Sequence, residues 1–260
     1  MSLIQPKKHL GQHFLKDNNI AKKIVESINL NNNKNVLEIG PGTGVLTSFL
    51  ETIPGINLKL VEIDRESVEH LTTHFPALAN NIIYKDILSL DLTGLFNENF
   101  NVIGNFPYNI SSPIFFKILE ARDKINQVIC MVQREVAQRI CANPGNKTYG
   151  ILSVLLQAFF KTDYLFTVSE NVFYPPPKVK SAEMRLERIK NKELGCDYEL
   201  FFRIVKASFN QRRKIIRNSL KSILLNLKIE DDIVLKRPEE LSVTQFVYLT
   251  NLISESNSVN

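Results

Sequence analysis

Cysteine and long apolar runs are both scarce in this sequence. Three of the 260 residues are cysteine, and Cys130, Cys141 and Cys196 have neither metal-site nor paired-disulfide spacing. No stretch of about 18 uninterrupted apolar residues occurs, so the sequence predicts no transmembrane helix. The N-terminal residues lack the apolar segment of a secretory signal peptide. We therefore expect a cytoplasmic protein with reduced thiols, without a metal centre and without a membrane anchor.

Acidic residues are absent from one long stretch. Between Arg203 and Lys228 the chain carries eight lysine or arginine residues and no aspartate or glutamate. A second basic cluster, formed by Lys7, Lys8 and Lys16, lies near the N-terminus. The net charge of +5 is modest, but its clustering predicts a polyanionic partner. On charge alone, a solvated helix face explains these residues equally well.

The apolar residues, 44% of the chain, are sufficient for a packed core and argue against wholesale disorder. Short apolar runs alternate with helix-length segments over most of the chain. The runs predict strands at residues 35–39, 58–63, 82–85, 101–104, 127–132 and 181–186. Strands separated by helices form βαβ units, so we expect an α/β fold with a mostly parallel sheet. Such a sheet binds ligands at the carboxyl ends of its strands.

The pattern changes after residue 132. Three successive prolines in the segment 173–179 exclude a helix or a central strand, so we expect an extended surface loop there. Residues 188–195 are polar and are typical of a linker. Beyond them, apolar residues recur on one helical face, namely Tyr198, Phe201, Phe202, Val205 and Phe209. The sequence therefore predicts two domains, residues 1–188 with the parallel sheet and residues 189–260 as a small all-helical domain.

A glycine-rich turn follows the first strand of the sheet. Gly40, Gly42 and Gly44 allow the backbone to turn tightly and to approach a ligand closely. A dinucleotide fingerprint would place the third glycine one position later. The Lys-Ser/Thr pair that holds a triphosphate is also missing. Taken alone, this loop is weak evidence for a ligand, because a plain turn between a strand and a helix is the alternative explanation.

Two acidic residues at strand ends favour a ligand over a plain turn. Glu62 ends the second strand, 22 residues after Gly40, where a carboxylate accepts hydrogen bonds from ribose hydroxyls. Asp86 follows the third strand, where a carboxylate can bind the amino group of adenine. Together these groups predict a nucleoside site that does not require phosphate, which fits S-adenosylmethionine. For Asp64 we expect a simpler role, as the N-cap of the next helix.

The fourth strand ends in the tetrapeptide Asn105-Phe106-Pro107-Tyr108. An exocyclic adenine amine is a poor nucleophile, because its lone pair is delocalised into the ring. Two acceptors on its N–H bonds, the Asn105 side-chain oxygen and a backbone carbonyl of the tetrapeptide, would localise that lone pair. Pro107 would hold the carbonyl in place, and Phe106 or Tyr108 would stack on the base. A base in such a site must be unpaired or flipped out of its stack.

The sequence resembles the small-subunit ribosomal RNA adenine N6-dimethyltransferases over nearly its whole length. The matching motifs are HLGQHFL at 9–15, the glycine loop, NFPYNI at 105–110, FYPPPKV at 173–179 and NQRRK at 210–214. The resemblance implies a Rossmann-like class I methyltransferase domain followed by a small helical domain. It implies S-adenosylmethionine as cofactor and dimethylation of two adjacent adenines in a hairpin loop near the 3′ end of 16S ribosomal RNA. The substrate would be an assembling small subunit.

The same resemblance assigns roles to individual residues. Cofactor contacts carry over to His13, Leu15, Gly40, Glu62, Asp86 and Asn105, with Gly42 in the same loop. Relatives often have asparagine in place of His13. Phosphate contacts to structured RNA fit Arg212, Arg213, Lys214 and Arg217. We expect a monomer.

Three alternatives stay open. The first is a resistance-type methyltransferase of large-subunit RNA, against which the motif at 210–214 and Phe106 argue. The second is a DNA adenine methyltransferase, which would need a clearer major-groove reader than the helical region offers. The third is an assembly factor that has kept the fold and RNA binding but has lost catalysis. Intact Asn105, Pro107 and Tyr108 disfavour this last alternative.

Overall fold

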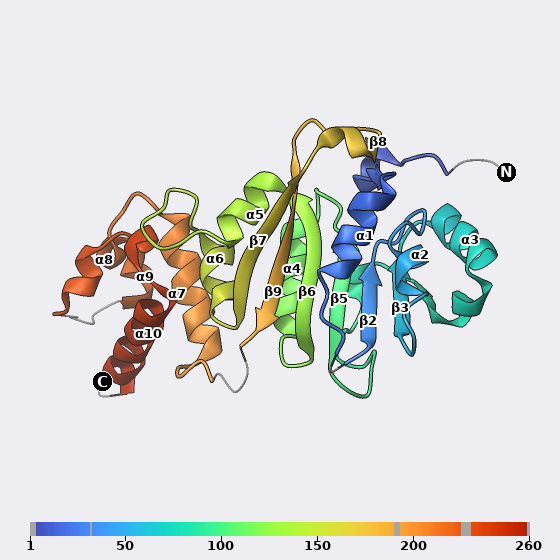
Figure 1. Cartoon of the computed structure of the whole chain (residues 1–260). Coiled ribbons are helices and arrows are strands. Elements are labelled where there is room, and N and C mark those ends of the chain that lie inside the picture. Colours follow the sequence, from blue (N-terminus) through green and yellow to red (C-terminus); the bar gives the residue numbers. More distant parts are fainter. Residues whose placement is uncertain (1–3, 32, 190–192, 225–229, 259–260) are drawn as a thin grey trace. The chain divides into compact units, whose positions relative to one another are not determined.

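The computed structural model describes residues 4–31, 33–189, 193–224 and 230–258 (Figure 1). Contacts within the chain divide it into two compact units. The first unit contains residues 1–137 and 163–188, and the second contains residues 138–162 and 189–260. Each unit is described by itself below.

The described residues form nine strands and ten α-helices. The strands are β1 Phe14–Leu15, β2 Asn35–Ile39, β3 Asn57–Glu62, β4 Ile82–Tyr84, β5 Phe100–Asn105, β6 Ile125–Gln133, β7 Phe160–Val168, β8 Phe173–Tyr174 and β9 Ser181–Arg188. The helices are α1 Asn18–Glu26, α2 Thr47–Leu50, α3 Arg65–His74, α4 Ser111–Glu120, α5 Arg134–Ile140, α6 Ile151–Gln157, α7 Tyr198–Asn210, α8 Ile216–Ser219, α9 Lys221–Leu224 and α10 Val243–Ser258.

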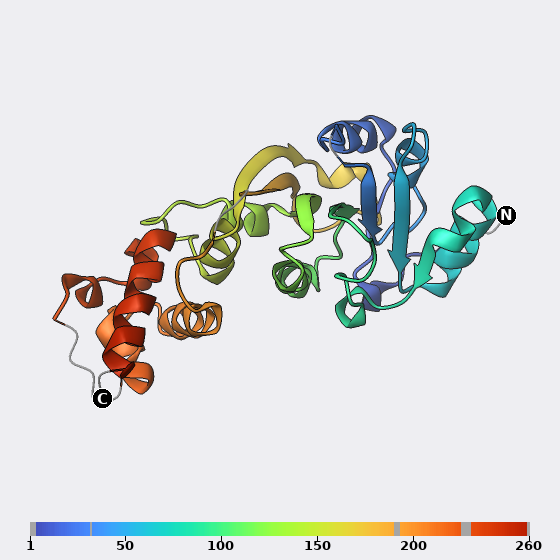
Figure 2. The ribbon, with the colours of Figure 1, turned by 90° about the horizontal axis from the view of Figure 1, so that it is seen from below.

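The main sheet of the first unit has the strand order β4-β3-β2-β5-β6-β9-β7. The pairs from β4 to β6 are all parallel, and β9 pairs antiparallel with β6. Helices α1 and α4 cover opposite faces of this sheet (Figure 2). Because both faces are covered, four successive residues of β2, from Val36 to Ile39, are buried. The predicted α/β fold with a mostly parallel sheet is confirmed.

Local sequence signals explain where α1 begins and which face it buries. The Asp17 carboxylate accepts hydrogen bonds from the amides of Asn19 and Ile20, at 2.9 and 3.1 Å, and so caps the helix. Ala21, Ile24 and Val25 then point into the core at helical spacing. This packing fixes the position of the short β1 strand that immediately precedes the helix.

Three strands, β1, β7 and β8, lie where the sequence pattern did not predict a strand. Part of the proline-rich segment, Phe173–Tyr174, forms β8 and pairs with β1 in a separate two-stranded sheet. Strand β7, Phe160–Val168, joins the edge of the main sheet next to β9. Pairing between segments about 160 residues apart is decided by tertiary contacts, which periodicity cannot reveal.

The second unit joins two separate stretches of the chain. The contact division assigns residues 138–162 to this unit together with residues 189–260. Helix α6 is almost wholly buried and packs on α7 and α10. The rings of Tyr149, Phe209 and Phe246 continue this core, with successive centroids 6.1 and 6.0 Å apart. No helix among the described residues is long and apolar enough to cross a membrane.

Candidate functional site

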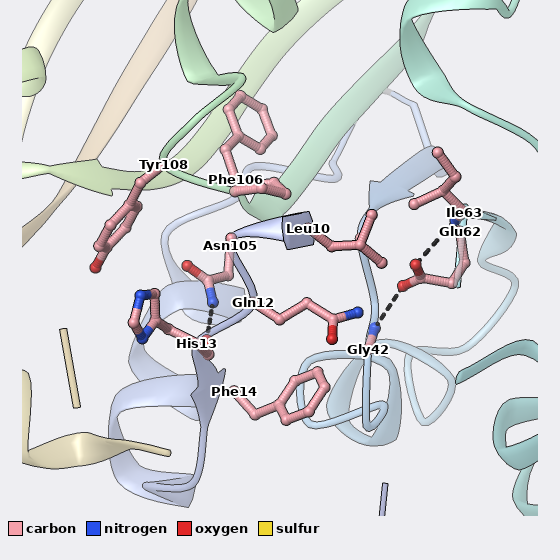
Figure 3. Close-up of a pocket in the computed structure, with 13 residues that line it drawn as sticks. Leu10, Gln12, His13, Phe14, Gly42, Glu62, Ile63, Asn105, Phe106 and Tyr108 are labelled. Carbon is pink, nitrogen blue, oxygen red and sulfur yellow. Dashed lines mark hydrogen bonds between the residues drawn. The ribbon is translucent and has the colours of Figure 1, made fainter. Parts of the chain in front are cut away.

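Two adjoining pockets lie at the carboxyl ends of β2, β3 and β5 in the first unit. Leu10, Gly40, Glu62, Ile63 and Pro107 line both of them. Figure 3 shows the first pocket, with the glycine loop and Glu62 on one side and the tetrapeptide residues on the other. The sheet therefore brings together three sequence motifs that are far apart along the chain, as the parallel topology predicts.

The glycine loop needs its glycines for conformation and for space. Gly40 and Gly42 have φ angles of 67° and 56°, in the left-handed region that other residues rarely adopt. A Cβ atom on Gly42 would also lie 2.9 Å from the ring of Phe14. The loop is thus a bare backbone cradle beneath the N-terminal segment, and a side chain at residue 42 would disrupt it.

Glu62 is the electrostatic centre of this side of the pocket. Its Oε2 accepts a hydrogen bond from the Gly42 amide at 3.0 Å, and its Oε1 accepts from the amides of Ile63 and Asp64, each at 2.9 Å. Burial raises the pKa of the carboxyl, and these three amides partly offset that rise. Oε2 retains acceptor capacity toward the pocket, so it can accept a hydrogen bond from a ribose hydroxyl.

The second pocket combines the carboxylate of Asp86 with several apolar side chains. Asp86 lines it, and its Oδ1 accepts from the Leu88 amide at 2.9 Å, which holds the carboxylate in place. Apolar side chains line the rest of this pocket. One of them, Ile63, is 45% exposed and follows Glu62 directly. Reasoning from single residues missed Ile63, although an apolar residue directly after a strand-ending acid was the available signal. The residues present thus fit a nucleoside cofactor.

Asn105 lies at the end of β5 and lines the first pocket. Its Nδ2 donates a hydrogen bond to the backbone carbonyl of His13 at 2.9 Å. Its Oδ1 is buried and has no hydrogen-bond partner among the described residues. A buried acceptor without a partner costs about 1–3 kcal/mol, so its retention here points to a ligand donor.

The two aromatic residues of the tetrapeptide are placed differently. Phe106 is fully buried and packs edge-on against Phe115, with ring centroids 5.9 Å apart. Tyr108 lies at the other side, where its ring stacks on His13 with centroids 5.3 Å apart. The Tyr108 hydroxyl forms a hydrogen bond with the Ser181 hydroxyl. Of the two rings predicted to stack on a base, Tyr108 is therefore the available one.

The N-terminal segment covers the first pocket. Residues 10–14 line it, whereas Leu15 belongs to the hydrophobic core and lines neither pocket. The Asp64 carboxylate receives hydrogen bonds from Lys7, Ser67 and Gln12. Burial alone would raise the pKa of Asp64, but these hydrogen bonds hold it below its usual value. Asp64 does occupy the expected N-cap position of α3, but its side chain binds the N-terminal segment instead of capping.

The predicted RNA-binding residues lie in the turn that follows α7 and in α8, both in the second unit. Arg213, Lys214 and Arg217 are exposed. Arg212 differs, because its Nη2 donates to the carbonyl of Asn146 at 3.3 Å and its Nε lies 3.9 Å from Glu239. Lys228, at the end of the basic stretch, lies outside the described residues. The exposed cations are free to meet a polyanion, whereas Arg212 also serves the packing of its own unit.

Comparison with known proteins gives concordant relatives. The profile of the family described as ribosomal RNA adenine dimethylase matches residues 4–247. A protein of Parabacteroides distasonis named ribosomal RNA small subunit methyltransferase A is 56% identical over 263 residues, covering 99% of this chain and 97% of its own. A protein of the same name from Flavobacterium johnsoniae is 54% identical over 255 residues and covers 97% of each chain.

Two solved structures share the fold. A dimethyladenosine transferase from Plasmodium falciparum has a TM-score of 0.79 and 24% identity, covering 94% of this chain and 98% of its own. The 23S rRNA methyltransferase ErmE has a TM-score of 0.67 and 25% identity, covering 92% and 99%. These likenesses confirm the predicted Rossmann-like class I methyltransferase fold. With the family profile and the full-length relatives, they lead to one conclusion: this chain belongs to the ribosomal RNA adenine dimethylase family.

Proposed function

We propose that this protein dimethylates N6 of two adjacent adenines in a hairpin loop near the 3′ end of 16S ribosomal RNA. The methyl donor is S-adenosylmethionine, whose sulfonium supplies an already activated methyl group. The single observation that carries the proposal is the buried Asn105 Oδ1, which has no partner among the described residues and faces the cofactor pocket. An amide oxygen in that position can accept from an adenine amine and cannot act as a general base.

The chain's own residues then have separate tasks. Glu62 and the glycine loop orient the nucleoside part of the cofactor, with Asp86 at the adenine side. Asn105 accepts one N–H of the target amine, while the His13 carbonyl keeps the amide from turning over. A backbone carbonyl of the tetrapeptide accepts the second N–H, held in place by Pro107. Tyr108 stacks on the base, and water takes the proton from the ammonium product.

The partner follows from the relatives and from the basic residues. The small-subunit name is borne by relatives at more than half identity, which favours the small over the large subunit RNA as substrate. We infer that Arg213, Lys214 and Arg217 contact RNA phosphates, with Arg212 supporting them. We further propose that the protein acts as a monomer, in the cytoplasm, on an assembling subunit.

Methyl transfer from tritiated S-adenosylmethionine tests the proposal. Undermethylated small subunits serve as substrate, large subunits as control, and nucleoside analysis identifies the product. We expect dimethyladenosine on small subunits, and a loss of about 100-fold or more in kcat for Asn105→Ala. The exposed Asn97 supplies a matched control, because Asn97→Ala leaves the pocket untouched.

The other outcomes each contradict the proposal in a distinct way. Label on large-subunit RNA would identify a resistance-type methyltransferase. Label on neither subunit, with subunit binding retained, would favour a non-catalytic assembly factor. Full activity of Asn105→Ala would remove Asn105 from the mechanism.

A further inference from the structure

The segment after β8 returns to the active site instead of leaving it. This proline loop, residues 175–180, begins beside β1 and ends at Ser181 in β9. Strand β8 pairs with β1 through Phe14 with Tyr174 and Leu15 with Phe173. A ribbon of two residues per strand has little stability of its own. The loop therefore needs other contacts to hold its position.

His13 supplies one of these contacts. Its Nδ1 lies 2.7 Å from the carbonyl oxygen of Pro175, at the start of the proline loop. Because a carbonyl can only accept, Nδ1 carries the proton in this bond. The same ring stacks on Tyr108, with an interplanar angle of 30°. In Figure 3 the imidazole lies on the Tyr108 side of the pocket, away from Glu62 and Gly42.

The other end of the loop is tied to the same tyrosine. The Ser181 hydroxyl forms a hydrogen bond with the Tyr108 hydroxyl. Tyr108 thus holds the proline loop at both ends, through its ring face by way of His13 and through its hydroxyl by way of Ser181. Between these anchors most of the loop is exposed, including Val179 at 47%.

We propose that the His13 imidazole is a positioning residue, which fixes the proline loop against Tyr108 and so shapes the site for the target base. This role rests on the proposed function, since it concerns the base that Tyr108 receives. In this proposal the backbone and the side chain of His13 have different tasks. The backbone carbonyl orients Asn105, and the side chain serves the proline loop rather than the cofactor.

Three substitutions separate the two interactions of the ring. His13→Asn places an amide donor where Nδ1 stands but removes the stacked ring. His13→Phe keeps a ring for Tyr108 but removes the donor, and His13→Ala removes both. All three keep the backbone carbonyl that binds Asn105. His9→Ala, at an exposed histidine outside the pockets, is the matched control.

The absence of tryptophan from the chain allows a direct view of the loop. A Tyr174→Trp background puts one indole beside the loop, at a side chain that is 54% exposed. Acrylamide quenching of that indole measures how firmly the loop is held, without any methyl transfer. Calorimetry with S-adenosylmethionine and steady-state kinetics with small subunits complete the measurements.

We expect His13→Ala to raise KM for the subunit about three- to tenfold, the scale of one neutral hydrogen bond. The Kd for S-adenosylmethionine should change less than about twofold, and the introduced indole should become more accessible to the quencher. His13→Asn should have a KM close to that of the parent protein, because its amide can replace the Nδ1 donor. His9→Ala should match the parent protein in all three measurements.

Two results would overturn the role assigned to His13. One is unchanged quenching and KM in His13→Ala; the other is a weakened cofactor Kd with an unchanged KM. Because quenching and calorimetry require no catalysis, they decide this inference even if no subunit is methylated, an outcome that would contradict the proposed function alone.

Discussion

Lys7 and Asp64 form an ion pair that ties the N-terminal segment to the residue two positions after Glu62. Lys7 also lies 3.1 Å from Glu66, at the start of α3. The hydrogen bonds that the Lys7 ammonium donates to these two carboxylates raise the pKa of Lys7. Gln12 Nε2 adds a second link to Asp64, at 3.3 Å. The N-terminal segment, which lines the first pocket, is therefore fastened beside the end of β3, where Glu62 lies.

Breaking that ion pair should loosen the cover of the pocket. In Lys7→Met we expect the Kd for S-adenosylmethionine to rise about three- to tenfold, because the closed segment becomes less populated. Calorimetry measures the change. Lys8→Met, at a neighbouring position, is the matched control and should leave the Kd unaltered. Equal Kd values for the two variants would show that the pair does not govern closure.

Cofactor binding should depend on pH through Glu62. Burial raises the pKa of this carboxyl, and ribose hydroxyls donate best to its ionised form. At a pH where Glu62 is protonated in the free protein, cofactor binding therefore releases that proton. We expect affinity to rise with pH, by up to about tenfold per unit, and to level off above the raised pKa. Glu62→Gln should bind more weakly and lose this slope; a slope that persists in that variant would assign it to another group.

The free energy of unfolding should fall as the pH rises, because of the buried carboxyl of Glu183. It is fully buried in β9, neither carboxyl oxygen has a hydrogen-bond partner among the described residues, and burial raises its pKa well above the usual value. The native state keeps the proton that the unfolded chain releases above about pH 4.5. Its contribution is thus present at low pH and is lost as the pH rises toward the raised pKa.

Glu183→Leu should consequently unfold at higher denaturant concentration than the parent protein. We expect a gain of about 1–3 kcal/mol, the cost of a buried group without partners. The difference in free energy of unfolding between the two proteins should widen as the pH rises above about 4.5, where the unfolded chain releases the proton that native Glu183 keeps. Glu38, whose pKa burial raises to about 8, contributes equally to both proteins and cancels in the comparison. A difference in free energy of unfolding that stays constant or narrows as the pH rises would contradict this role of Glu183.

Charge reversal in the second unit should separate RNA contacts from packing. Arg213→Glu with Arg217→Glu should weaken subunit binding and flatten its salt dependence, by about one unit of slope for each lost phosphate contact. Lys22→Glu on α1 introduces a reversal at an exposed site and is the control. Cofactor affinity should remain unchanged in all of these variants.

Arg212→Ala should instead lower the free energy of unfolding, because it removes the contacts with Asn146 and Glu239. Chemical denaturation measures that loss. An Arg212→Ala protein with parental stability and much weaker subunit binding would assign Arg212 to the RNA surface alone.

The central strands and the site motifs were predictable because their signals are local. The apolar run of β2 and the glycines after it identify a strand and a tight turn without reference to the rest of the chain. Glu62, Asp86 and Asn105 lie at the ends of predicted strands, and parallel topology brings such ends to one edge. The pairing of β1 with β8 and the inclusion of residues 138–162 in the second unit had no comparable local signal.

The sequence by itself thus determined the fold class, the glycine loop and the polar groups at the strand ends, because each depends on residue type and short spacing. Only the tertiary structure decided how those groups are used. In the folded protein Phe106 packs in the core, whereas Tyr108 lies at the pocket. Asp64 binds Lys7 instead of a helix amide. The His13 ring forms a hydrogen bond with the carbonyl of Pro175. Each of these outcomes depends on which distant segment packs nearby, and a side chain chooses among partners only once the chain has brought them within hydrogen-bonding distance.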